Sequence, residues 1–384
     1  MIYLDNSATT NVYDTVIDEI ARVYRQANYN PSAAYDVASE AEKILENARK
    51  TIASSINAQN DEVYFTSGGS EGNNAAILGV SRACKNRGNH IITTSVEHDS
   101  VYNAIKYLES EEGYKVTYIS PDSHGEVSAK EVEDSVDKDT ILVSVMHVNN
   151  ETGSVNDIEK INKAVKQKNH LTIMHSDSVQ SYMKLPIDVE QSGVDIITAS
   201  AHKVHGPKGI GFMYIRKNTK IQPLIYGGGQ ERGFRSGTEN VALASGFAKA
   251  VSQIQGNKEY ADSIRKSRDY LKILIEKNIR DININTPETS APHILSVSFA
   301  GVRSEVLLHY LETDKIYVST GSACSARKKG SRVLKNIGLP EIYADGTVRF
   351  SLDENSSKSD MDIVCEKLIK YIDIIRKATR YKLK

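Results

Sequence analysis

The alternation of apolar and amphipathic segments constrains the fold of this 384-residue chain more than any other feature. Several short runs consist of β-branched or apolar residues throughout, as expected for strands buried on both faces of a sheet. These runs lie at Val63–Thr66, Ile91–Thr94, Val116–Ile119, Ile141–Met146, Leu171–Asp177, Val194–Thr198 and Gly209–Ile215. Before and between them, apolar residues recur at helical spacing, for example over residues 35–56 and 75–83. The βαβα order predicts a mainly parallel sheet with helices on both faces.

Polar residues gather where these expected strands end. The positions concerned are Gly69, Ser70, His98, Asn149, Asp177, Gln180 and Lys203. Ligands of open α/β sheets bind outside the carboxyl ends of the strands, so the sequence predicts one ligand site built from these residues. Surface decoration is the alternative interpretation, and the recurrence of polar residues at successive strand ends argues against it.

Lys203 lies in a tight loop, Ser200–Gly211, which carries glycines and a proline between two expected strands. A lysine held at a strand end inside a pocket is suited to imine chemistry, because burial lowers its pKa and leaves the amine neutral and nucleophilic. For an isolated loop lysine, a solvent-exposed position is the commoner case. The neighbouring polar strand ends favour the functional interpretation of Lys203. We expect the competing Lys208, which lies beyond the glycine–proline turn, to face solvent or to have a structural role.

Two glycine-rich segments are candidate phosphate sites. The strand–turn–helix pattern around Ser67–Asn74 directs free backbone N–H groups and the positive end of a helix to one point. Its sequence is neither a Walker A loop nor a dinucleotide-binding fingerprint, and an ordinary capped turn is an equal alternative. Residues 226–240 combine glycines with arginines and hydroxyl groups, which suits either phosphate contact or a flexible surface loop.

A second unit is expected after the sheet. A long helical region from Val241 to about Lys277 precedes a polar, proline-bearing stretch near Asn278–Pro292. Alternating segments at 294–299 and 348–352 then indicate a small α+β domain. We therefore divide the chain into an N-terminal segment of the small domain (1–15), a large domain (16–260) and a small C-terminal domain (261–384).

Charge and cysteine content exclude several classes of protein. The net charge of −1 gives no argument for a nucleic-acid or membrane partner, and no apolar run approaches the length of a transmembrane helix. The N-terminus lacks the basic and apolar regions of a signal peptide. The three cysteines, Cys84, Cys324 and Cys365, have no paired spacing, which argues against a disulfide framework or a zinc ribbon. We expect a cytoplasmic protein.

Motifs along essentially the whole chain occur in an order that a known family shares. They are Tyr3–Thr10 (YLDNSATT), Thr66–Glu71 (TSGGSE), His147–Gly153 (HVNNETG), Asp177–Ser181 (DSVQS), the Lys203 loop, Arg235–Thr238 (RSGT) and Ser322–Ser325 (SACS). On these motifs the chain resembles the cysteine desulfurases of the nitrogen-fixation and iron–sulfur-cluster type, which have the class V aminotransferase fold. The resemblance implies an α/β protein with a large domain on a mainly parallel seven-stranded sheet and a small α+β domain.

The resemblance also implies that the large domain binds pyridoxal 5′-phosphate (PLP). Lys203 would hold the cofactor as an imine and then act as acid and base, and Asp177 would keep the pyridine nitrogen protonated so that the ring accepts electrons. Gln180 would hydrogen-bond the ring oxygen, and His98 would stack on the ring and help proton transfer. The residues that would hold the phosphate are Gly69, Ser70, Ser200 and His202.

Three further residues would complete the site on the same resemblance. Asn149 would lie near the ring oxygen and the substrate, and Arg349 would bind the α-carboxylate of L-cysteine, a task that suits a bidentate guanidinium. Thr238 would reach the phosphate of the neighbouring subunit, which implies a homodimer with shared sites.

Cys324 would carry the distinctive chemistry. It lies among small and polar residues, and the cations of Arg327–Lys329 favour its thiolate. The thiolate would attack the sulfur of the bound cysteine, giving alanine and a persulfide on Cys324. Cys84 and Cys365 lie in apolar helical patterns, and we expect them to be buried and inert.

Departures from the family pattern leave the sulfur acceptor open. Tyr35 stands where the family usually has histidine, Asp353 where glycine is common, and the segment after Cys324 is strongly basic. An iron–sulfur scaffold, a tRNA-thiolation enzyme and other cofactor carriers all remain as acceptors. We expect no intrinsic metal, although Cys324 could transiently ligate a cluster together with a scaffold. The alternative functions are another class V enzyme, such as an aminotransferase or a selenocysteine lyase, and a sulfur-relay scaffold without activity, which has no need of Lys203 and Asp177.

Overall fold

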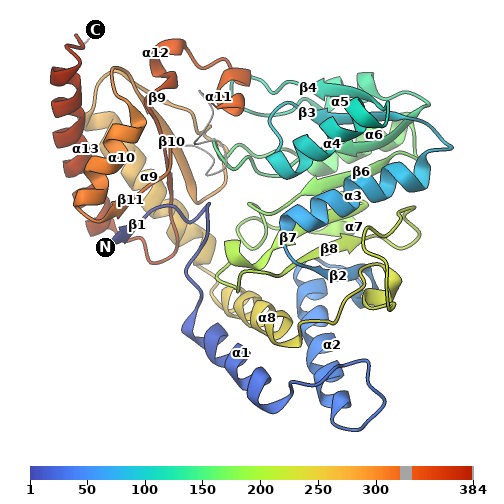
Figure 1. Ribbon diagram of the computed structural model, residues 1–384. Coiled ribbons are helices and arrows are strands. Elements are labelled where there is room, and N and C mark those ends of the chain that lie inside the picture. Colours follow the sequence, from blue (N-terminus) through green and yellow to red (C-terminus); the bar gives the residue numbers. More distant parts are fainter. Residues whose placement is uncertain (321–330, 383–384) are drawn as a thin grey trace.

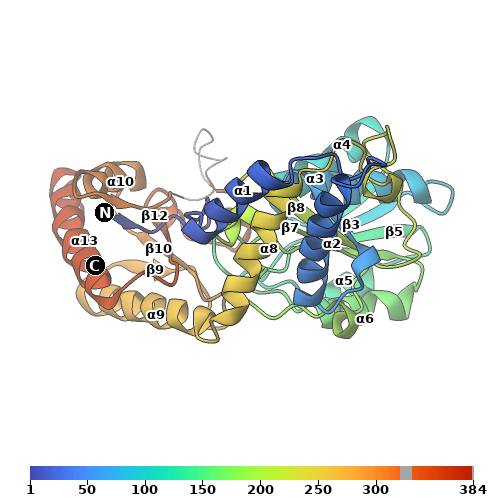
Figure 2. The same ribbon diagram turned by 90° about the horizontal axis from the view of Figure 1, so that it is seen from below.

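The computed structural model describes residues 1–320 and 331–382, which form a larger and a smaller lobe (Figures 1 and 2). The larger lobe contains the main sheet. The smaller lobe contains the N-terminus and the C-terminal helix, so the two ends of the chain lie on the same side of the molecule.

The larger lobe is built on a seven-stranded sheet with the order β2-β8-β7-β6-β5-β3-β4. The strands are β2 (Val63–Thr66), β3 (His90–Thr94), β4 (Lys115–Ile119), β5 (Thr140–Ser144), β6 (Ile173–Asp177), β7 (Ile196–Ser200) and β8 (Gly211–Ile215). Neighbouring strands from β7 to β4 are parallel, whereas β8 runs antiparallel to both β7 and β2. The predicted mainly parallel seven-stranded sheet is thereby confirmed.

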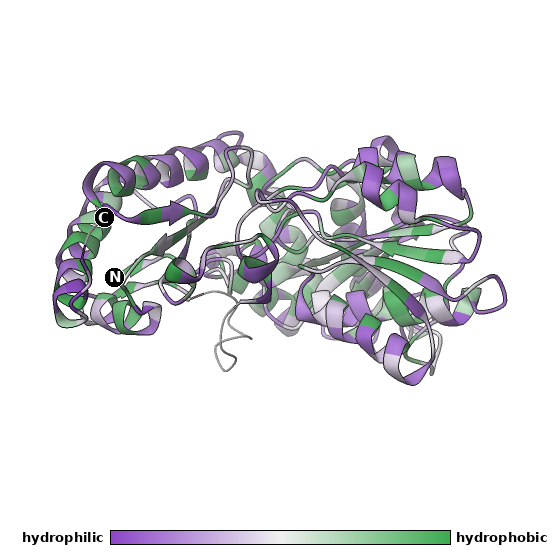
Figure 3. Ribbon diagram, turned by 90° about the horizontal axis from the view of Figure 1, so that it is seen from above, coloured by the Kyte–Doolittle hydropathy of each residue, from purple (hydrophilic) through white to green (hydrophobic). Residues whose placement is uncertain are grey.

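Helices cover both faces of this sheet. Helices α3 (Gly69–Cys84) and α4 (Asp99–Glu111) lie on one face, and α5 (Ala129–Ser135) and α6 (Ile158–Lys168) lie on the other (Figure 2). The short helix α7 (Val189–Ser192) packs against α6. Figure 3 shows mainly hydrophobic strands between helices that carry many hydrophilic residues, which is the pattern of a sheet buried between two helical layers. Helices α1 (Asp14–Gln26) and α2 (Ala38–Ser55) both pack against α8 (Val241–Gly256) near the β2 edge.

The smaller lobe contains an antiparallel sheet with the order β12-β10-β9. Its elements are α9 (Tyr260–Asn278), β9 (Ile282–Ile284), β10 (Ile294–Phe299), α10 (Ser304–Thr313), β11 (Ile316–Tyr317), α11 (Arg332–Asn336), α12 (Glu341–Ala344), β12 (Thr347–Ser351) and α13 (Lys358–Ala378). Strand β1 (Ile2–Tyr3) pairs with β11, which ties the start of the chain to this lobe. Within the part of the chain that the structure describes, no helix is both long and apolar enough to cross a membrane.

The helical region expected from Val241 to about Lys277 is present, and it consists of two helices, α8 and α9, rather than one. Gly256 ends α8, and Asn257 takes an extended conformation in which its side-chain oxygen accepts a hydrogen bond from the Glu259 N–H at 3.2 Å. Glycine and asparagine both favour such an interruption, the first through backbone entropy and the second through local hydrogen bonds.

Candidate active site

The carboxyl ends of the parallel strands meet at a cavity of about 280 Å³. Eight of the residues predicted from the sequence line it, namely Gly69, Ser70, His98, Asp177, Gln180, Ser200, His202 and Lys203. Their neighbours in the wall include Ser7, Ala8, Asn73, Ser100 and Asn150. A larger hollow of about 1330 Å³ beside α5 and α6 contains none of the predicted residues. The smaller cavity is therefore the candidate active site.

Lys203 ends a short 3₁₀ helix that follows β7 directly. Its Nζ donates to the backbone carbonyls of Ser7 and, at 2.9 Å, Ala8, which directs the amine into the cavity. A second lysine lies behind it: Lys184 Nζ donates to the Lys203 carbonyl at 2.6 Å. Burial, and then the charge of Lys203, lower the pKa of Lys184 to about 7. Lys208, by contrast, is exposed and lines no part of this cavity, as expected.

Asp177 ends strand β6, and its carboxylate is held from two sides. Oδ2 accepts from Asn73 Nδ2 at 2.7 Å, and Oδ1 accepts from the Val179 N–H at 3.0 Å. Thr198, on the neighbouring strand β7, donates to the amide oxygen of Asn73. A buried carboxyl group that accepts such bonds is fixed in direction, which suits it to pair with a cationic group of a ligand.

The turn before α3 approaches its neighbours too closely for any side chain at Gly69. A Cβ atom there would lie 2.6 Å from Val179 Cγ2. The bare turn brings the first N–H groups of a sixteen-residue helix to the cavity, facing Ser200 and His202. Burial, and then the charge of Lys203, lower the pKa of His202 to about 4, so its imidazole is neutral. Backbone donors, a hydroxyl and an imidazole thus surround one point, as in an anion site.

His98 is the N-cap of α4 and connects to Asp177 through hydrogen bonds. Its Nδ1 accepts from the Ser100 N–H at 3.2 Å, and this acceptor role assigns the proton of a neutral ring to Nε2. The Ser100 hydroxyl lies 2.8 Å from the same Nδ1 and accepts from Asn73 Nδ2 at 2.8 Å. Asn73 therefore bridges Asp177 and Ser100. Sequence reasoning missed both Asn73 and Ser100, although Asn73 belongs to the glycine-rich turn motif.

Gln180 is held between the N-terminal segment and the small lobe. Its Nε2 donates to the Ser7 carbonyl at 3.0 Å, and its Oε1 accepts from His293 Nε2 at 3.1 Å. His293 is fully buried, and burial followed by the nearby cations lowers its pKa, so its ring is neutral. One Nε2 hydrogen of Gln180 remains for a ligand in the cavity.

Two predicted substrate residues lie behind the cavity wall rather than in it. The amide of Asn149 is engaged by the backbone, because Oδ1 accepts from the N–H groups of Glu151 and Thr152 in its own turn and Nδ2 donates to the Val96 carbonyl. Asn150 lines the cavity in its place. Arg349, on β12, donates to the Asn150 carbonyl at 2.7 Å.

The guanidinium of Arg349 also pairs with Asp5 at 2.8 Å. Its Nε is buried and has no hydrogen-bond partner among the described residues. A buried donor without a partner is costly, so Nε marks a place where an anionic ligand would be stabilised.

Thr238 is exposed and does not line the cavity of its own chain. The segment that carries it is anchored by two ion pairs. Arg235 Nε lies 2.9 Å from Glu71 Oε1 in the first turn of α3, and Glu231 Oε2 lies 2.6 Å from Arg49 Nη1 in a buried pair. Thr238 is thus presented outward on a fixed segment.

Cys84 and Cys365 are free and buried, and burial raises the pKa of each thiol. This is the inert state that the sequence predicts for them. Cys324 lies outside the described residues.

The described residues on both sides of the Cys324 segment are attached close to the cavity. The N–H of Ser319 donates to the Arg349 carbonyl at 3.1 Å, and the hydroxyl of Ser331 donates to Glu151 at 2.5 Å. Arg332 donates to the backbone of Glu97 at 2.7 Å. Cys324 is five positions from Ser319, and five extended residues span at most about 17 Å.

The comparisons with known proteins agree with this geometry. Residues 2–364 match the family "Aminotransferase class-V". The chain is 40% identical to the cysteine desulfurase IscS of Clostridium botulinum (strain Hall) over 97% of its own length and 94% of that protein. It is 39% identical to the enzyme of the same name from Dictyoglomus turgidum, over 99% and 97% of the two chains.

Solved structures show the same similarity. A "NifS-like protein" superposes with a TM-score of 0.92 at 39% identity and covers 97% of this chain and 99% of its own. A structure described as "SspA in complex with cysteine" superposes with a TM-score of 0.83 at 35% identity, over 93% and 100% of the two chains.

Proposed function

Since the chain belongs to aminotransferase class V and is a cysteine desulfurase, we propose that it holds PLP in the cavity around Lys203 and passes sulfur from L-cysteine to Cys324. The observation that carries the proposal is the wall of the cavity. It joins a lysine, a buried carboxylate and a glycine-led helix N-terminus around about 280 Å³.

These residues fit the chemistry of PLP. The start of α3, with Ser200 and His202 opposite, offers hydrogen-bond donors for a phosphate group. Gly69 is required at this helix start, because a Cβ atom there would collide with Val179. Asp177 offers a fixed negative charge for a protonated ring nitrogen, and Lys203 offers an amine for the aldehyde. When bound, PLP supplies an electron sink for the electron pair released as the C–S bond of the substrate breaks.

The residues around the cofactor would position the substrate and move its protons. Lys203 would take the α-proton of cysteine and return a proton to the product carbon. His98 would offer its Nε2 proton on the side of the cavity fixed by Ser100. Arg349 would bind the α-carboxylate through its unpartnered Nε, and Asn149 would shape this end of the site through the turn that places Asn150.

Cys324 would act as the sulfur acceptor within the chain. Its thiolate would form an S–S bond to the substrate sulfur while the C–S bond breaks, and the electron pair left on carbon would take a proton. Cysteine thereby becomes alanine, and Cys324 becomes a persulfide. Support comes from the two attachments of its segment beside the cavity, at Ser319 and Ser331.

We propose a homodimer in which Thr238 contacts the phosphate bound by the partner chain. Large apolar side chains are exposed in two segments, including Tyr29, Tyr35 and Tyr226. Helix α1 contacts the start of α8 through the Tyr24 hydroxyl, which donates to Asn240 at 3.5 Å. Exposed aromatic residues are enriched at protein–protein interfaces.

The persulfide would then pass to a second protein in the cytoplasm. An iron–sulfur scaffold and a tRNA-thiolation enzyme are both suitable acceptors, because each offers a thiolate that can attack a persulfide. The basic residues Arg327–Lys329 beside Cys324 favour an acceptor with an acidic surface.

Replacing Cys324 tests the sulfur-transfer step. We expect Cys324→Ser to keep PLP but to lose persulfide formation and alanine production by about a hundredfold or more, because a covalent nucleophile is removed. Cys84→Ser and Cys365→Ser should stay active, since both thiols are buried. Mass spectrometry after incubation with L-cysteine should find added sulfur on the Cys324 peptide. Full turnover in Cys324→Ser would favour an aminotransferase or a selenocysteine lyase.

A matched lysine pair tests the cofactor. We expect purified protein to absorb as a PLP enzyme and borohydride to fix the cofactor on the peptide that contains Lys203. Lys203→Ala should lose this adduct, whereas Lys208→Ala should keep it because that side chain is exposed and outside the cavity. The opposite result would transfer the assignment to Lys208.

A further inference from the structure

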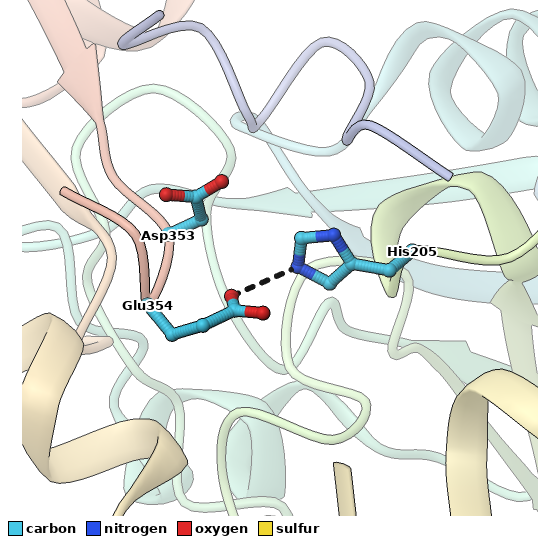
Figure 4. Close-up of side chains that lie close together, drawn as sticks. All are labelled: His205, Asp353 and Glu354. Atoms are coloured by element: carbon cyan, nitrogen blue, oxygen red, sulfur yellow. Dashed lines mark ion pairs between the residues drawn. The ribbon is translucent and has the colours of Figure 1, made fainter. Parts of the chain in front are cut away.

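A second cluster of chemically active side chains lies outside the candidate active site. His205 comes from the loop after Lys203, and Asp353 and Glu354 follow strand β12 of the smaller lobe. Figure 4 shows the His205 ring and the Glu354 carboxylate directed toward each other, with Asp353 beside them. His205 Nε2 lies 3.2 Å from Glu354 Oε2, and one donor atom from each of the three residues lies within 4.8 Å of the others.

The hydrogen bonds of His205 determine which ring nitrogen carries a proton. Nδ1 lies 2.8 Å from the Asn11 carbonyl, which can only accept, so Nδ1 bears a hydrogen. In the neutral ring, Nε2 therefore presents a lone pair to Glu354 Oε2. Neither Nε2 nor Oε2 has a hydrogen-bond partner among the described residues, and His205 is only 1% exposed. A lone pair that faces a carboxylate oxygen with little access to water requires a positive charge between them.

Surrounding groups fix the three side chains in place. The Tyr13 hydroxyl donates to the other oxygen of Glu354 at 2.5 Å, and the Tyr13 ring stacks on His205 with 4.3 Å between centroids. Asp353 Oδ1 accepts from the Asn355 N–H at 3.0 Å and from the Ser356 hydroxyl at 3.2 Å. Metal-binding histidines commonly donate their second N–H to a carbonyl, and metal-binding carboxylates are themselves hydrogen-bonded. All three side chains have such support.

The net charge of the cluster is also unbalanced without a bound cation. Two adjacent carboxylates lie here, of which Asp353 is buried and Glu354 is partly exposed. Two carboxylates beside a single imidazole leave a net negative charge, which a divalent ion would neutralise.

We propose that His205 Nε2, Glu354 and Asp353 form a binding site for one divalent transition-metal ion, with zinc as the best match. Zinc takes nitrogen and oxygen ligands at about 2.0–2.2 Å in a tetrahedron, which places neighbouring ligand atoms about 3.4 Å apart. The observed 3.2 Å between Nε2 and Oε2 is close to that separation, and water would fill the fourth position. Calcium and magnesium prefer six or more oxygen ligands and are a poorer match.

Such an ion would join three distant parts of the chain. It would connect the loop after Lys203, the segment before α1 through Tyr13, and the end of β12 in the smaller lobe. The inference uses neither PLP nor Cys324, so it stands apart from the proposed function. It departs from the expectation, drawn from the sequence alone, of a protein without an intrinsic metal.

The test uses PLP-loaded Cys324→Ser protein, because this variant cannot bind metal through Cys324. After chelator treatment, titration with Zn²⁺ in a calorimeter should give one equivalent per chain and raise the thermal midpoint. X-ray absorption of the zinc complex should show one imidazole nitrogen, oxygen ligands and no sulfur. Asp353→Asn and Glu354→Gln, each made in this background, should weaken binding at least about tenfold. The thermal midpoint of each metal-free variant checks its folding.

The chain offers a matched control. His309 and Glu312 form a similar pair at 3.3 Å on α10, but both side chains are exposed. Glu312→Gln should therefore leave zinc binding unchanged. Absence of a bound equivalent, equal binding in Glu354→Gln, or a sulfur ligand in the X-ray absorption spectrum would overturn the proposal. If no zinc binds, the positive charge between His205 and Glu354 is a proton on the imidazole, and the two residues form an ordinary ion pair.

Discussion

The direction of the functional side chains is set by one asparagine. Asn73 donates one amide hydrogen to Asp177 and the other to Ser100, and its oxygen accepts from Thr198. Ser100 in turn contacts Nδ1 of His98. Because every group of the amide is used, Asn73 fixes two side chains that lie at the ends of different strands. A neutral amide does this without adding a charge beside the carboxylate.

Glu97 is a buried acid next to this network. Its Oε1 accepts from Thr94 at 2.8 Å and from the Met146 N–H at 2.9 Å, while Oε2 has no partner among the described residues. Burial raises the pKa of Glu97 to about 8. The carboxyl is thus largely protonated at neutral pH in the folded protein, whereas in the unfolded chain it ionises at its ordinary pKa.

The sign of the resulting pH dependence follows from linkage. Since the folded state binds this proton more tightly, the contribution of Glu97 to the free energy of unfolding falls as pH rises from about 4.5 toward 8. We expect the free energy of unfolding of Glu97→Gln to lack this fall. Its stability relative to the parent chain should therefore increase by about 1–3 kcal/mol as the pH rises from 5 to 8. Denaturant unfolding of both proteins across this range measures the difference. A difference that stays constant with pH would mean that Glu97 is ionised in the folded protein.

At the scale of elements, the close approach of α3 to β7 shapes the predicted phosphate site. A Cβ at Gly72, inside α3, would lie 2.9 Å from Thr198 Cγ2 on β7, and one at Gly69 would lie 2.6 Å from Val179 Cγ2. Glycine in a helix interior normally costs about 1 kcal/mol relative to alanine. Here the two glycines allow the start of the helix to pack closely against the end of the strand. This packing offsets the cost of glycine and places the helix N-terminus at the cavity.

Gly72→Ala tests the packing of α3. The gain in helix propensity, about 1 kcal/mol, competes with overpacking of about 1–3 kcal/mol against a stiff threonine. We expect a net loss of about 1 kcal/mol and weaker PLP affinity, because α3 must move away from β7. Gly256→Ala is the matched control, since no atom lies within 4 Å of its Cβ at the end of α8. Thermal midpoints with and without PLP measure both effects, and equal behaviour of the two variants would contradict the argument.

Most elements were predictable because their apolar pattern is strong. Strand β2 has the predicted bounds, and β6 begins at Ile173 rather than Leu171, which is exposed and precedes the sheet. The cavity wall was predictable where function requires a residue type at a strand end, as for Asp177 and Lys203. Asn73, Ser100 and Lys184 could not be found in this way, because a hydrogen bond between distant residues leaves no periodic signal in the sequence.

At the scale of the whole molecule, the N-terminal segment connects the two lobes at the cavity. Leu4 bonds to Tyr317 of the smaller lobe at 2.8 Å, and Thr10 bonds to the His202 carbonyl of the larger lobe at 2.9 Å. Between these points, the Ser7 carbonyl accepts from both Lys203 and Gln180. Folding of the site therefore requires both lobes, although its predicted cofactor ligands come mainly from the larger one.

The outward position of Thr238 leads to a prediction about two chains. If Thr238 serves the partner's phosphate, a dimer of one Lys203→Ala chain and one Thr238→Asp chain contains one intact site, because the unaltered Lys203 and the unaltered Thr238 meet there. Each variant alone should be poorly active: the first lacks the amine, and the second sets a carboxylate against a phosphate. Co-expression should restore activity, and sedimentation should give twice the 42.4 kDa chain mass. If Thr238 instead acted within its own chain, both sites of the mixed dimer would be defective and co-expression would not restore activity. Either that failure or a fully active monomer would refute the shared site.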